Sequence, residues 1–114
     1  MEKLDSAGLP ESIQYWNLEY EMSGLAARYA RMRYHYLKEF QEEVCRQMFQ
    51  EGTLGEHLRE TGEQAEELQE RLVRQMAEQD PPPDKASDSL GWTAHMNGLI
   101  AQAREIVLHD RIYC

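Results

Sequence analysis

Residues 53–79 read TLGEHLRETGEQAEELQERLVRQMAEQ, and DPPPD follows at 80–84. Apolar or small side chains recur in this stretch every three or four positions, which is the spacing of one face of an α-helix, and charged side chains fill the other face. Three consecutive prolines cannot continue a helix. The stretch therefore predicts one long helix that ends near residue 79 and carries a narrow apolar stripe, made of Leu54, Leu58, Thr61, Ala65, Leu68, Leu72 and Met76.

The two residues before this helix predict a sharp boundary. Gly52 suits the left-handed geometry that ends many helices. Thr53 can cap the following helix, and Glu56 three residues later completes the pattern of a capping box. We therefore expect one helix to end at Gly52 and the next to begin at Thr53.

A second helical pattern covers about 10–51. Pro10 fits the first turn of a helix, where its missing N–H costs nothing, and apolar residues then follow helical spacing up to Met48. A glycine inside a helix is unfavourable by roughly 1 kcal/mol, so we expect a kink or break at Gly24. Residues 1–9 are predicted to be a disordered leader.

A third helix is predicted to start within 84–89 and to end near His109, with Ile112 and Tyr113 as a short extended tail. No segment shows the alternation of a β-strand. The predicted fold is all-α, an antiparallel bundle of three main helices in a single domain over 10–114. Its predicted core consists of Tyr29, Met32, Tyr36, Phe40, Leu58, Ala65, Leu68, Leu72, Trp92, Met96, Leu99, Ala103 and Ile106.

The composition fits a folded, acidic protein. Of the 114 residues, 41% are hydrophobic and 29% are charged, which is ordinary for a globular chain and unlike a disordered one. The net charge is −9, so most of the surface should repel nucleic-acid phosphates. The start of the chain lacks the pattern of a signal peptide, and no stretch reaches the roughly 20 apolar residues that cross a bilayer. We expect a cytoplasmic protein without a membrane partner.

No arrangement of residues predicts an active site or a metal site. His35, His57, His95 and His109 stand apart from other metal-ligating residues at ligand spacing. Cys45 and Cys114 form no disulfide framework and are expected to be free thiols. No glycine-rich phosphate loop is present, and no nucleophile has a base at a recognisable spacing. We expect no enzyme activity, no cofactor and no metal.

Two surfaces stand out as candidate binding sites. The first is a basic flank of the 10–51 helix, for which one interpretation is contact with phosphates and the other, which we favour, is pairing with the acids of residues 41–80. The second is a face of small residues on the last helix, which would let another helix, such as one from a second copy of the chain, approach closely. The flank comprises Arg28, Arg31, Tyr34, His35 and Lys38, and the face comprises Ala94, Gly98, Ala101 and Glu105.

Several short motifs are spread from about Gly24 to the end of the chain, namely Tyr36-Leu37-Lys38-Glu39-Phe40, Gly52-Thr53-Leu54 with Leu58, Glu63-Gln64-Ala65, Arg71-Leu72, Gln75-Met76, Trp92-Thr93, Met96-Asn97, Ala103-Arg104-Glu105-Ile106-Val107 and Ile112-Tyr113. In these motifs the chain resembles the TnpV family of transposon-encoded proteins, which are small accessory products of mobile elements.

The resemblance implies a mobile-element context and no particular reaction. The first hypothesis is a non-enzymatic accessory protein that acts through helical contacts with a protein, either a second copy of itself or the recombinase of its element. The alternative is a DNA-binding recombination or excision factor that uses the basic flank of the 10–51 helix.

Overall fold

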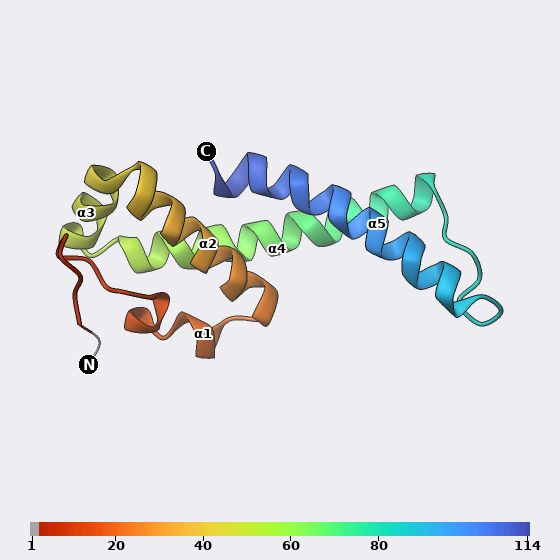
Figure 1. The fold of residues 1–114 in the computed structure, drawn as a ribbon, viewed down its shortest axis with the longest axis horizontal. Helices are drawn as coiled ribbons and strands as arrows, with labels where there is room; N and C mark the ends of the chain where they lie inside the picture. Colours follow the sequence, from red (N-terminus) through yellow and green to blue (C-terminus); the bar gives the residue numbers. More distant parts are fainter. Residues whose placement is uncertain (1–2) are drawn as a thin grey trace.

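The computed structural model describes residues 3–114, which form an elongated helical molecule with extents of 54 × 26 × 19 Å. The long helix α4 runs through its middle, as Figure 1 shows, with the other elements arranged along it. In chain order the elements are a 3₁₀ helix at Ile13–Trp16, α1 at Leu18–Glu21, α2 at Gly24–Phe40, α3 at Glu42–Glu51, α4 at Leu54–Gln79, α5 at Ser89–Val107 and a π-helical turn at Leu108–Ile112.

Most predicted helix boundaries are confirmed. A new helix, α2, begins at Gly24, and the Ser23 side chain caps it by accepting a hydrogen bond from the Ala26 N–H at 3.1 Å. Gly52 has a φ of 77° after α3, and α4 ends at Gln79 directly before the prolines. The predicted capping box at Thr53 is wrong, because its hydroxyl donates backward to the Met48 carbonyl at 3.3 Å and does not cap α4.

Three local predictions differ from the structure. The first regular element starts at Ile13 rather than at Pro10, and it is a short 3₁₀ helix. The helix predicted to run on to residue 51 is interrupted at Gln41, whose φ of −136° lies outside the helical region. At the other end, Ile112 is not in an extended tail but closes a π-helical turn and is fully buried.

The all-helical class is confirmed, and residues 3–114 contain no β-strand beyond an isolated bridge between Leu4 and Pro10. The arrangement is not a bundle of three helices lying side by side over their whole length. Figure 1 shows α2 along the first half of α4, while α5 crosses the second half and diverges from it toward the 80–88 loop. The two halves of the molecule therefore have different thickness.

Burial follows this division. One core joins the N-terminal segment (residues 3–23), α2, α3 and the start of α4. A smaller core joins α2, the middle of α4, the end of α5 and the C-terminal turn. Between residues 66 and 98, all of which the structure describes, no side chain is fully buried. The first core comprises Leu9, Ile13, Leu18, Ala30, Tyr34, Leu37, Cys45, Leu54 and Leu58, and the second comprises Tyr29, Ala65, Val107 and Ile112.

The disordered leader predicted for residues 1–9 is wrong for the described residues 3–9, whereas residues 1 and 2 lie outside the described part. Leu9 is fully buried in the first core. The Asp5 carboxylate accepts hydrogen bonds from the N–H groups of Ala7 and Leu9 and pairs with Lys38 at 2.7 Å. Lys38 and the core that surrounds Leu9 belong to later segments, so residues 1–9 alone do not predict this order.

The buried face of α2 is rotated by about a quarter of a turn from the predicted stripe, at 100° per residue. Phe40 is 67% exposed, and Met32 and Tyr36 are only half-buried, whereas Tyr34 and Leu37 are fully buried. The reason is that α2 packs on two sides, against α4 and against the N-terminal segment. On α5, Ile106 is also more exposed than predicted, at 39%.

A glycine sets how closely α2 and α4 approach. A Cβ at position 62 would lie 2.4 Å from the Ala26 carbonyl oxygen and 2.7 Å from the Met22 methyl carbon. Gly62 is fully packed in the middle of α4 despite the poor helix propensity of glycine. Its missing side chain lets the α2 backbone contact α4 directly.

We therefore predict opposite effects for the same substitution at two helical glycines. Gly62→Ala should destabilise the protein by about 1–3 kcal/mol, because the α2 backbone would have to move. Gly98→Ala on α5 should stabilise it by about 0.5–1 kcal/mol, because a Cβ there meets nothing within 4 Å and alanine favours the helix. Urea unfolding of both variants tests this pair, and a stabilising Gly62→Ala would contradict the close contact.

Candidate functional site

The predicted basic flank of α2 is largely covered by the N-terminal segment. Tyr34 is fully buried, and its hydroxyl donates to the Pro10 carbonyl. Arg31 pairs with Glu19 at 2.8 Å, and Lys38 pairs with Asp5 at 2.7 Å. Of the five flank residues, only two are exposed, namely Arg28 and His35.

The acids that pair with this flank come from a different segment than predicted. We expected them in residues 41–80, but Asp5 and Glu19 both precede α2. The hydrogen bond from Lys38 lowers the pKa of the Asp5 carboxyl, and the hydrogen bond from Arg31 lowers the pKa of Glu19. The acids of the N-terminal segment thus pair with two cations of α2 that would otherwise be open to solvent.

All four residues of the predicted small-residue face lie on the exposed side of α5, opposite the side that packs on α4. The face is formed by Ala94, Gly98, Ala101 and Glu105. The packed side is confirmed by the burial of Leu99 and Ala103. This leaves a flat outer helix surface with one charged side chain near its end.

The structure also contains a buried arginine that is not among the predicted site residues. Arg33 is only 9% exposed. Its guanidinium donates to the main-chain oxygens of Ile112 and Cys114, both at 2.9 Å, and to the His57 ring at 3.3 Å. None of these partners is an Asp or Glu side chain. Arg33 therefore joins α2, α4 and the C-terminal residues through hydrogen bonds.

The environment of His57 depends on this arginine. Burial, followed by the charge of Arg33, lowers the pKa of His57 below its usual 6.5. The neutral ring can accept the hydrogen bond from the Arg33 side chain, whereas a protonated ring would lose the acceptor and place a second positive charge beside it. The contact therefore requires a neutral histidine.

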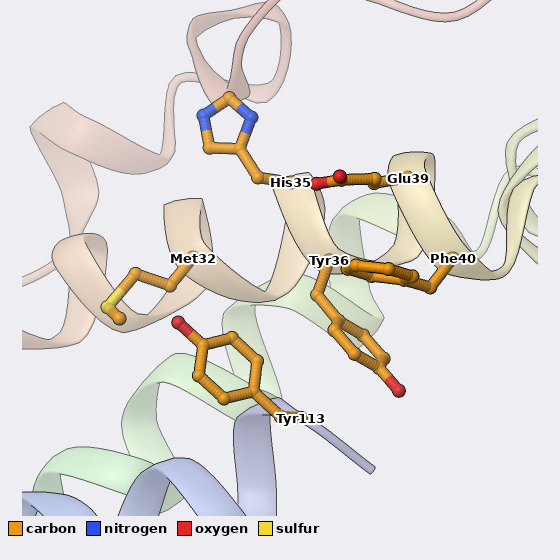
Figure 2. Close-up of a pocket in the computed structure, with 6 residues that line it drawn as sticks. All are labelled: Met32, His35, Tyr36, Glu39, Phe40 and Tyr113. Carbon is orange, nitrogen blue, oxygen red and sulfur yellow. The ribbon is translucent and has the colours of Figure 1, made fainter.

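Beside the anchored C-terminal residues, three aromatic rings form a row at the surface, in which Phe40 and Tyr113 are exposed and Tyr36 is half-buried. The Tyr36 ring centroid lies 5.2 Å from that of Phe40 and 5.5 Å from that of Tyr113. Figure 2 shows these rings together with Met32 nearby, while the His35 and Glu39 side chains point away from them. Together these six residues line an open pocket of about 380 Å³.

Within residues 3–114, no group of three His, Cys, Asp or Glu side chains is placed to hold a metal ion. Both cysteines are free, and burial raises the pKa of the Cys45 thiol to about 11. A thiol with such a pKa carries little of the reactive thiolate form at neutral pH. In the same described part, no helix is both long and apolar enough to cross a lipid bilayer.

The sequence profile of the family described as transposon-encoded protein TnpV matches residues 14–112, which is nearly the whole chain. This chain belongs to the TnpV family. The resemblance seen in the sequence starts at about Gly24, whereas the profile match begins ten residues earlier, at residue 14. The match therefore includes part of the N-terminal segment that covers α2. It also includes Arg33, Tyr36, Phe40 and the outer face of α5. No curated protein and no solved structure matches the chain.

The contact between Arg33 and His57 predicts a pH dependence of stability. Because the pKa of His57 is lowered on folding, the unfolded chain takes up the proton first as the pH falls. The free energy of unfolding should therefore decrease below about pH 6.5 and level off once the folded histidine is also protonated. Denaturant unfolding across this range measures the decrease.

A matched pair of variants isolates this contribution. His57→Gln keeps an acceptor for Arg33 but does not titrate, so the decrease should become smaller. His35→Gln on the exposed side of α2 should leave it unchanged. An unchanged pH dependence in His57→Gln would show that this histidine does not couple stability to pH.

Proposed function

We propose that this TnpV-family protein is a non-enzymatic accessory protein of a transposon and that it binds a protein partner through the outer face of α5. The partner is a second copy of the chain or the recombinase of the same element. The family supports the transposon context. The observation that carries the binding role is the unequal distribution of charge and burial between α4 and α5.

The charge content of the two helices differs strongly. The 26 residues of α4 include ten Asp, Glu, Lys or Arg side chains, whereas the 19 residues of α5 include only Arg104 and Glu105. A helix that carries few charges on any side is usually buried on most of its surface. In the free chain α5 packs mainly on α4 and leaves its other side open, which supports a partner on that side.

The shape of the outer face supports a helix as the contacting element. Ala94, Gly98 and Ala101 lie near one another on the exposed side of α5, and small side chains let two helix backbones approach closely. Leu90, which is 84% exposed, extends the apolar surface at the start of the helix. Covering these side chains would remove apolar area from water.

The half of the molecule in which α5 crosses the second half of α4 is the thin half, and it gives a second reason for a partner. Leu72, Met76, Trp92 and Met96 are all half-buried, although each is an aromatic or long apolar side chain of a kind that normally belongs in a core. Two helices alone cannot enclose such residues, and bundles of four do so readily. A partner helix or hairpin would supply the missing layer.

The alternative role in DNA binding has less support. Of the flank that would contact phosphates, Tyr34 is buried, and Arg31 and Lys38 are engaged with acids. Binding of element-end DNA that weakens steeply with salt and is lost in Arg28→Ala would favour this alternative.

The proposal predicts that a charge on the outer face of α5 disrupts a protein complex. The chain is co-expressed with the recombinase of its element, and complexes are measured by co-purification and by light scattering. The wild-type chain should form a complex with the recombinase or with itself. Ala101→Glu should weaken that complex about tenfold or more, because an unpaired carboxylate would be buried in it.

Gln50→Glu on α3 is the matched control, since it adds the same charge at an exposed position on another helix. It should leave the complex intact, and both variants should keep the helical content of the wild type. A wild-type chain that stays monomeric and does not bind the recombinase, or an Ala101→Glu complex as tight as that of the wild type, would contradict the proposal.

A further inference from the structure

The aromatic row formed by Tyr113, Tyr36 and Phe40 lies on a different surface from the outer face of α5. Phe40 is 67% exposed and Tyr113 is 48% exposed. Apolar side chains gathered at a surface, unlike scattered ones, commonly mark a binding site. Aromatic residues in particular contribute much of the energy at protein interfaces.

The row is held in place before any partner binds. Tyr113 lies between two residues whose main-chain oxygens accept hydrogen bonds from Arg33, and one of them, Ile112, is fully buried. The Arg33 guanidinium also lies 5.7 Å from the centre of the Tyr36 ring. A fixed arrangement lowers the entropy that binding would otherwise have to overcome.

The apolar surface continues from α2 onto α3. Glu39 and Phe40 line both the pocket of Figure 2 and a neighbouring hollow of about 430 Å³ that reaches Val44. Val44 is 47% exposed. Phe40, the most exposed ring of the row, lines both hollows, so that one partner segment would contact both through it.

The rim of this surface is acidic. The residues that line the two hollows include Glu39, Glu42 and Glu43 and contain no lysine or arginine. Glu42 pairs with Arg46, whereas Glu39 and Glu43 have no ion-pair partner among residues 3–114. The C-terminal end of α2 lies here as well, and the helix dipole at such an end favours cations.

We propose that this surface docks a protein segment that presents a bulky apolar side chain flanked by lysines or arginines. The apolar side chain would enter the pocket beside Tyr36 and Phe40, and the flanking cations would meet the acidic rim and the faces of the exposed rings. This goes beyond the proposed function, because it concerns a second surface and names the chemistry of its ligand.

The charge of the chain argues against the other occupants. A second copy carries the same net charge of −9, and two of its clustered cations, Arg31 and Lys38, are already paired with acids. Nucleic acid would bring phosphates against the carboxylates of the rim. A basic segment of another protein complements both the apolar and the acidic parts.

An unbiased selection tests the proposal. Random peptides long enough for about four helical turns are displayed and selected on the full-length chain, and the winning peptides are then synthesised and titrated. Selected peptides should combine an aromatic or large aliphatic residue with lysines or arginines. Phe40→Ala should weaken their binding about tenfold or more, the effect of truncating a central aromatic anchor.

Two further variants separate the contributions. Tyr20→Ala removes another exposed aromatic ring, 83% exposed on α1, and should leave binding unchanged. Glu39→Gln combined with Glu43→Gln should weaken binding and reduce its salt dependence. Three outcomes would each overturn the proposal. They are selected peptides that are not enriched in lysine or arginine, peptide binding that is unchanged in Phe40→Ala, and a surface that binds only a second copy of the chain. None of these outcomes depends on Ala101, so the role of the α5 face is tested separately.

Discussion

The close approach of α2 and α4 at Gly62 is the constraint on which the rest of the structure depends. Because no side chain separates Gly62 from the Ala26 backbone, the two helices are in direct contact over the first half of α4. This contact places Tyr29 in the second core and brings Arg33 within reach of His57 and of the C-terminal residues. The N-terminal segment packs against another side of α2.

The same contact makes the molecule uneven. Where α2 covers α4, the N-terminal segment and α3 add further layers, and the side chains Leu54, Leu58 and Ala65 are fully buried. Just beyond Ala65, α2 still reaches α4, because the hydroxyls of Ser23 and Tyr29 donate to Glu66 and Gln69. The apolar stripe continues through Leu68 and Leu72 without full burial. The stripe keeps its helical spacing along the whole of α4. What changes along the helix is the number of elements that cover it.

This division separates the two proposed binding surfaces. The outer face of α5 belongs to the thin half, where an added helix would complete a layer. The aromatic row belongs to the thick half, where buried contacts of Arg33 and Ile112 hold exposed rings in place. Under the two proposals, the protein would join two partners, one on each half of the molecule.

The sequence predicted the features that are encoded locally and missed those that depend on distant partners. The bounds of α4, the end at Gly52 and the break at the prolines follow from glycine, proline and helical spacing, and all are confirmed. The buried face of α2 was misplaced because one apolar stripe indicates one packing side, whereas α2 packs on two. Arg33 was overlooked because a charge is normally expected at the surface, although its position between Tyr29 and Tyr36 in the apolar pattern was a usable signal.

The order of residues 3–9 could not be predicted either, since it depends on Lys38 and Tyr34, which follow much later in the chain. The same limit applies to the aromatic row. Tyr36 and Phe40 have the spacing of core residues, and only the path of the C-terminal turn decides that they remain at the surface beside Tyr113.

Hydrogen exchange of the backbone amides of α4 tests the central claim most directly, namely that the distal half of the helix is incomplete without a partner. In a monomeric sample, the amides up to about residue 65 should exchange only through global unfolding. Those of residues 66–79 should exchange faster through local opening, and they should become protected when the partner of α5 is added. Equal protection along the whole of α4 in the free monomer would contradict the account.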